Sequence, residues 1–141
     1  MPKFSAKSKR LVAKLHPSLR AICEEAIKEI DFTVMDSTRG RAAQELAFRR
    51  GNSKAHFGDS AHNYEPAIAM DLAPYPVDFD NIQRFKDLAA VILRIAKAKG
   101  VKLRWGGDWN MDGSTSDGWD FPHFELHPWR TYAKQSQLVK D

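Results

Sequence analysis

Three side chains that can bind a metal ion lie in or beside predicted strands. His62 ends a polar segment, His123 opens the last predicted strand, and Asp71 lies inside the apolar run 67–73. A carboxylate in such a strand is costly to bury unless it is paired or binds a metal. Catalytic zinc sites use three ligands from His, Asp or Glu and leave a fourth position for water. The residues therefore fit a zinc site, and a salt bridge from Asp71 to an arginine is the alternative they leave open.

The elements that must position these residues follow from hydrophobic periodicity and from helix start and stop signals. Helices are expected at 17–29, 41–50 and 81–99, and the last has Asp80 as its N-cap and Gly100 after its end. Strands are expected at 32–35, 67–73, 101–105 and 121–127. Helices and strands do not alternate regularly, which predicts an α+β fold with a small mixed, mainly antiparallel sheet and helices packed around it.

Length and composition indicate one domain over residues 1–141, with a loose C-terminal tail from about residue 130. The single cysteine, Cys23, excludes an internal disulfide and a cysteine-rich zinc finger, and its place on an apolar helix face predicts a buried thiol. No stretch approaches the roughly 20 apolar residues of a membrane span. The basic N-terminus lacks the apolar core of a signal peptide, so we expect the protein to stay in the cytoplasm of the cell that makes it.

The net charge of +4 and the isoelectric point near 9.3 indicate an anionic partner. Nucleic acid, a membrane surface and an anionic cell wall are all compatible with this charge. The positive residues are scattered, and the densest run lies at the N-terminus, between Lys3 and Lys14.

The order of three short motifs resembles a family of zinc metallopeptidases. Ser60-Ala61-His62 is followed by Ala69-Met70-Asp71 and later by Asp120-Phe121-Pro122-His123. This order is similar to that of the family that includes D-alanyl-D-alanine carboxypeptidases and phage L-alanyl-D-glutamate endolysins. Its first motif runs Ser-x-His and then Gly-x-Ala-x-Asp, and its second places an acidic residue three positions before a His. Two further segments resemble the family: Thr38-Arg39 with Gln44, and the run 104–110.

The sequence departs from the family pattern between its first two ligands. Eight residues separate His62 from Asp71, where the family usually has six, and Glu65-Pro66 resembles a two-residue insertion. Ala67 stands where the family has glycine, so the loop must turn without the conformational freedom of that glycine.

The resemblance implies a role for each site residue. His62, Asp71 and His123 would hold Zn²⁺, and Asp120 would act as general base. Glu125 is the rival base, because residues 123 and 125 share one face of a strand. Arg39 would stabilise negative charge on the carbonyl oxygen of the substrate. The remaining two candidates, Ser60 and Gln44, would donate or accept hydrogen bonds with the substrate.

The resemblance implies an endolysin that cuts the L-alanyl-D-glutamate bond of bacterial peptidoglycan. The lack of a signal peptide favours an endolysin, which a separate membrane-permeabilising protein releases onto the wall. A D-alanyl-D-alanine carboxypeptidase or dipeptidase of the same fold is the alternative. A non-catalytic zinc or nucleic-acid-binding module is a remote alternative, since it needs four protein ligands and only three are visible. We expect a monomer with no nucleic-acid partner and no stable insertion into a membrane.

Overall fold

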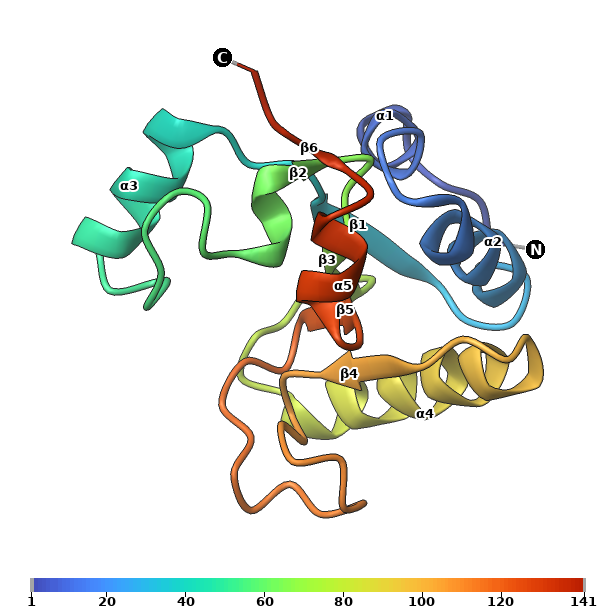
Figure 1. Cartoon of the computed structure of the whole chain (residues 1–141). Helices are drawn as coiled ribbons and strands as arrows, with labels where there is room; N and C mark the ends of the chain where they lie inside the picture. The colour runs from blue at the N-terminus through green and yellow to red at the C-terminus, as the bar shows by residue number, and fades with distance from the viewer. Residues whose placement is uncertain (1, 141) are drawn as a thin grey trace.

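Four strands form one antiparallel sheet in the computed structural model, which describes residues 2–140 (Figure 1). They are β1 (Phe32–Asp36), β3 (Ala69–Pro74), β4 (Leu103–Trp105) and β5 (His123–Leu126), in the order β1-β3-β5-β4 across the sheet. A separate two-stranded sheet pairs β2 (Tyr64–Glu65) with β6 (Gln137–Leu138). The architecture confirms the predicted α+β domain, and every pair of neighbouring strands is antiparallel.

Five α-helices and a short 3-10 helix complete the domain within residues 2–140. They are α1 (Ala6–Val12), α2 (Pro17–Ala26), α3 (Arg41–Arg49), the short 3-10 helix η1 (Ala61–Asn63), α4 (Ile82–Ala98) and α5 (Trp129–Ala133). Figure 1 shows α3 on the opposite side of the molecule from α1 and α2. The predicted apolar stripe of α4 is buried from Phe85 to Ala96, whereas Ile82 is 37% exposed. Cys23 on α2 is fully buried, as predicted.

The predicted helices and strands are present, and their ends shift by a few residues. Gly51 and Gly100 follow the ends of α3 and α4 with positive φ, the conformation that favours glycine after a helix. The prediction of Asp80 as the N-cap of α4 is wrong. The neighbouring Asn81 caps the helix, because its side chain accepts a hydrogen bond from the Arg84 backbone N–H at 3.4 Å.

Two segments differ more strongly from the prediction. The helix α1 has no counterpart among the predicted helices, because its basic residues leave only a narrow apolar face. Its buried Ser8 accepts a hydrogen bond from the Val34 backbone N–H at 3.0 Å, which fixes α1 against β1. After Pro128, where a loose tail is expected, the chain forms α5 and β6. The Val139 N–H donates to the Asn63 carbonyl at 2.8 Å, so this segment supports η1. No helix among residues 2–140 is both long and apolar enough to cross a bilayer.

Candidate metal centre

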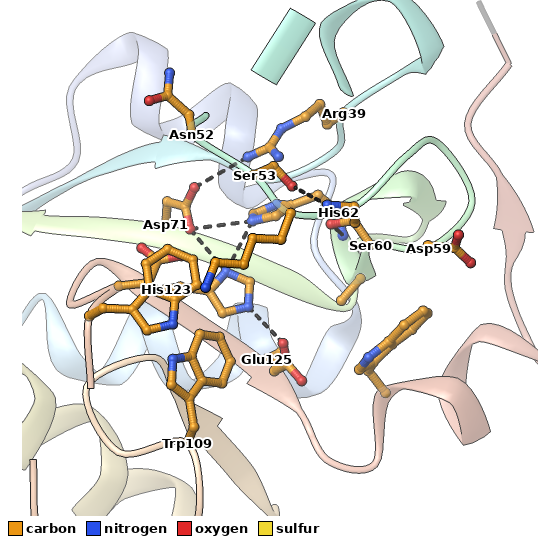
Figure 2. Close-up of a pocket in the computed structure, with 16 residues that line it drawn as sticks. Arg39, Asn52, Ser53, Asp59, Ser60, His62, Asp71, Trp109, His123 and Glu125 are labelled. Atoms are coloured by element: carbon orange, nitrogen blue, oxygen red, sulfur yellow. Dashed lines mark hydrogen bonds and ion pairs between the residues drawn. The ribbon is translucent and has the colours of Figure 1, made fainter. Parts of the chain in front are cut away.

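Strand register places two of the three predicted ligands side by side. On neighbouring strands β3 and β5, Asp71 lies opposite His123. On the other side of β3, Asp71 lies opposite Asp36 at an irregularity in β1. His62 reaches the same place from η1 (Figure 2). The fold therefore brings His62 and Asp71, which lie 9 positions apart, together with His123, which lies 52 positions after Asp71.

Hydrogen bonds fix which nitrogen of each histidine faces the centre. The Nδ1 of His62 lies 2.8 Å from the Ser37 carbonyl oxygen, which only accepts, so Nδ1 carries the proton and Nε2 keeps its lone pair. The Nε2 of His123 lies 2.7 Å from Oε1 of Glu125 and donates to that carboxylate, so Nδ1 is its free nitrogen. Both lone pairs point toward Oδ1 of Asp71 (Figure 2).

The spacing of the three donor atoms fits a tetrahedral ion. The Nε2 of His62 lies 3.3 Å from Oδ1 of Asp71 and 3.3 Å from Nδ1 of His123, and the third distance is 3.2 Å. Donors about 2.0–2.1 Å from a tetrahedral zinc ion are separated from one another by about 3.3–3.4 Å. The three residues present therefore fit a metal ion.

The electrostatics of the centre favour a cation. Burial lowers the pKa of His123, but hydrogen bonds and charges from Asp71 and Glu125 outweigh burial and raise this pKa to about 10. Burial raises the pKa of Asp71, but the charge of His62 and the hydrogen bonds of both histidines hold it well below its usual range. Three converging lone pairs thus attract positive charge, which a proton or a metal ion can supply.

The turn that carries His62 is held by its own caps. Ser60 and Asn63 form a capping box around η1, in which the Ser60 hydroxyl accepts from the His62 backbone N–H at 3.2 Å. The His62 carbonyl in turn accepts from the Arg39 backbone N–H at 2.6 Å. His62 and Arg39 are therefore fixed to each other through the backbone.

Arg39 lies beside the metal centre and is only 15% exposed at its side chain. Its Nε and Nη2 donate to Oδ2 of Asp36 at 3.1 and 3.0 Å, and its Nη1 donates to Oε1 of Gln44 at 3.0 Å. Its Nη2 is also 3.6 Å from Oδ2 of Asp71, so the salt bridge left open by the sequence exists alongside the histidine contacts. Two of the five guanidinium N–H groups remain free of these three hydrogen bonds.

A cavity of about 340 Å³ opens over His62, Asp71 and His123 (Figure 2). Residues that line it include Arg39, Ser60, Trp109 and Asp120. The Asp120 carboxyl makes no side-chain hydrogen bond to the described residues. Its pKa is raised by burial and by the charge of Asp71, against the opposing charges of His123, His62 and Arg39. A Cβ on Gly106 would collide with the Asp120 carbonyl oxygen, so this glycine permits the close approach that sets Asp120 in place.

Sequence comparison identifies the family of this chain. Residues 1–127 match the family described as phage L-alanyl-D-glutamate peptidase. The chain belongs to this family. The match covers all three candidate metal ligands and ends before α5, so the last two elements of the chain lie outside it.

Two relatives agree with the family match. The L-alanyl-D-glutamate peptidase of Escherichia phage T5 is 28% identical over 137 residues, which cover 88% of this chain and 97% of the relative. The crystal structure of the Serratia marcescens L-Ala D-Glu endopeptidase ChiX superposes with a TM-score of 0.73 at 26% identity, over 93% of this chain and 94% of that one. The fold over 93% of this chain is therefore shared with a solved endopeptidase.

Glu125, the rival candidate for the general base, lines the cavity, but both of its carboxylate oxygens are already paired. One carboxylate oxygen accepts from His123, and the other accepts from Nε and Nη2 of Arg104 at 3.2 and 2.7 Å. Arg104 lies directly opposite Glu125 in the register of β4 and β5. Carboxylates that bind the second nitrogen of a metal-ligating histidine orient its ring and raise its basicity. The geometry therefore fits Glu125 as a residue that positions His123.

The two predicted substrate contacts of the peptidase differ in accessibility. Ser60 lines the cavity and is half-buried. Gln44 is fully buried and does not line the cavity. Its amide donates to Ser53 and Ala55 and accepts from Arg39 and Asn63. These contacts leave no group for a substrate, so the geometry does not support a substrate contact by Gln44 and places it behind Arg39 instead.

The two-residue insertion between the ligands is absorbed by local structure. Glu65 belongs to β2 and pairs with Gln137 of β6. Ala67 is fully buried, and its backbone bonds to Lys14 and His16. Met111 is the only non-glycine residue with positive φ in the described part of the chain, so Ala67 needs no glycine-like conformation. The departure from the family pattern therefore leaves the ligands in place.

Proposed function

We propose that this phage L-alanyl-D-glutamate peptidase is a zinc enzyme that hydrolyses the L-alanyl-D-glutamate bond of peptidoglycan stem peptides. The family match supports the bond that is cut. The metal is supported by one observation, the convergence of three lone pairs at mutual distances of 3.2–3.3 Å over an open cavity.

The proposed roles follow from the positions of the side chains. His62, Asp71 and His123 hold the ion, which when bound supplies a Lewis acid that acidifies water and polarises a carbonyl group. Asp120, with its raised pKa, takes a proton from the attacking water and delivers it to the leaving amine nitrogen. Arg39 directs its free N–H groups toward negative charge on the carbonyl oxygen. Ser60 offers a hydroxyl group to the peptide backbone of the substrate.

The alternatives are weaker for different reasons. The family match favours the L-alanyl-D-glutamate bond over the D-alanyl-D-alanine bond. A structural zinc module closes its metal with four protein ligands, whereas three residues converge here beneath a cavity. We further propose that the peptidase is a monomer and reaches the wall from the producing cytoplasm through a separate membrane-permeabilising protein.

Digestion of purified peptidoglycan tests the proposed bond. Mass spectrometry of the fragments should find new carboxyl ends on L-alanine and new amino ends on D-glutamate, and a chelator should abolish both. New ends at D-alanine would instead support the carboxypeptidase alternative, and chelator-resistant cleavage would refute the metal mechanism.

A further inference from the structure

The proposed mechanism leaves one lysine of the cavity wall, Lys54, without a role. Lys54 lies in the loop between α3 and η1, and its Nζ sits 4.8 Å above the ring of Trp119. Among the described residues that line the cavity, Lys54 and Arg39 are the only lysine and arginine. Arg39 is held by Asp36 and Gln44, while Lys54 forms no ion pair with any residue in the range 2–140.

Aromatic contacts fix Lys54 relative to the metal centre. Trp119 packs against Trp109 with ring centroids 5.8 Å apart, and Trp109 packs against His123 at 5.6 Å. A cation within about 6 Å of an aromatic ring is attracted to its face. The chain of rings therefore runs from a metal ligand to the ammonium group and holds that group at the cavity wall.

The substrate carries a charge that this cation can meet. A glutamyl residue after the cut bond has two carboxyl groups, and only one of them can continue the peptide. The other stays free within a few bonds of the leaving nitrogen. The cavity is already rich in carboxylates that would repel it: Asp59, Asp71, Asp120 and Glu125. The free carboxylate of the glutamyl residue therefore needs a cation that offsets this repulsion.

We propose that Lys54 binds the free carboxylate of the D-glutamyl residue and selects substrates in which that group is not amidated. This inference rests on the proposed function, since it assumes that the glutamyl side of the bond occupies the cavity. Lys54 is the cation available for the task, because Arg39 is bonded to Asp36 and its remaining N–H groups are assigned to the carbonyl oxygen.

Two soluble peptides test the proposal. They share the L-alanyl-D-glutamyl bond and differ only in the carboxyl group that does not continue the chain, which is a free acid in one and a carboxamide in the other. The wild-type enzyme should cleave the acid with a kcat/KM roughly 10–100-fold higher, the usual range for a hydrogen bond between charged groups. Lys54→Gln should lose this preference by slowing the acid peptide alone, with zinc content unchanged, and Lys54→Arg should retain it.

The control is Lys7→Gln, which removes the same charge from an exposed lysine on α1 and should keep the preference. Equal losses on both peptides in Lys54→Gln, or a preference that survives it, would overturn the proposal. A wild-type enzyme that cleaves both peptides equally well would also overturn it while leaving the proposed function intact. A wild-type enzyme that cleaves neither peptide would overturn the proposed function and this inference with it.

Discussion

Replacement of Glu125 by glutamine tests whether this buried residue positions His123 or carries the proton. The Glu125 carboxylate accepts from His123 on one oxygen and from Arg104 on the other. A glutamine has one acceptor and one NH₂ group in the same place. Whichever way its amide is turned, an N–H group faces either the His123 N–H or the Arg104 guanidinium. The variant therefore cannot satisfy both donors.

We expect the Glu125→Gln substitution to weaken metal binding. Loss of a carboxylate that orients a ligating histidine typically lowers metal affinity about 10–100-fold. This range corresponds to roughly 1.4–2.8 kcal/mol of binding free energy. Competition with a chromophoric chelator measures the affinity, and activity at saturating zinc should recover most of the wild-type rate. Glu24→Gln, an exposed substitution on α2, is the matched control and should leave zinc affinity unchanged.

A double variant tests whether the unpaired donor causes the loss of zinc affinity. In Glu125→Gln with Arg104→Gln, the residue at 125 can accept from His123 and donate to the amide oxygen at 104. We therefore expect part of the zinc affinity to return. Wild-type zinc affinity in the single variant, combined with a loss of about 10²–10⁴ in kcat at saturating zinc, would refute this account and make Glu125 the general base.

The remaining predictions concern the other carboxylates and the net charge. Asp120→Asn should keep zinc bound and lower kcat by about 10²–10⁴, or roughly 3–5.5 kcal/mol of transition-state stabilisation; loss of zinc in this variant would place Asp120 among the ligands. Asp71→Asn should instead lose zinc, measured by metal analysis, because it removes the anionic ligand; full zinc occupancy would contradict its role. Cleavage of whole walls should fall with added salt more than cleavage of a soluble peptide, since exposed charges are screened beyond roughly 8–10 Å; equal salt sensitivity would argue against attraction by the charge of +4.

Much of the candidate metal centre could be predicted from the sequence because its three candidate ligands stand out chemically. Asp71 is a charged residue in an apolar strand, and His62 and His123 flank strand or loop boundaries. Side-chain alternation also places residues 123 and 125 on one face. The register between β3 and β5, which sets Asp71 opposite His123, is a tertiary property and follows from the whole sheet.

Other contacts at the site cannot be predicted from local sequence patterns. The Ser37 carbonyl that orients His62 is a backbone group, which any residue type carries. The role of Glu125 depends on its pairing with Arg104 across β4 and β5, which sequence spacing does not reveal. Gln44 lies on a short helix whose buried face is polar, so periodicity does not show that it is buried. Lys54 lies in a loop without a periodic pattern, and its contact with Trp119 depends on the tertiary fold.

A crystal structure of the zinc-loaded protein, with anomalous diffraction recorded at the zinc edge, tests the central claim most directly. The account predicts one anomalous peak per chain, about 2.0–2.2 Å from Nε2 of His62, Oδ1 of Asp71 and Nδ1 of His123, with no fourth protein ligand. A peak elsewhere, a fourth protein ligand that closes the site, or coordination through Nε2 of His123 would contradict it.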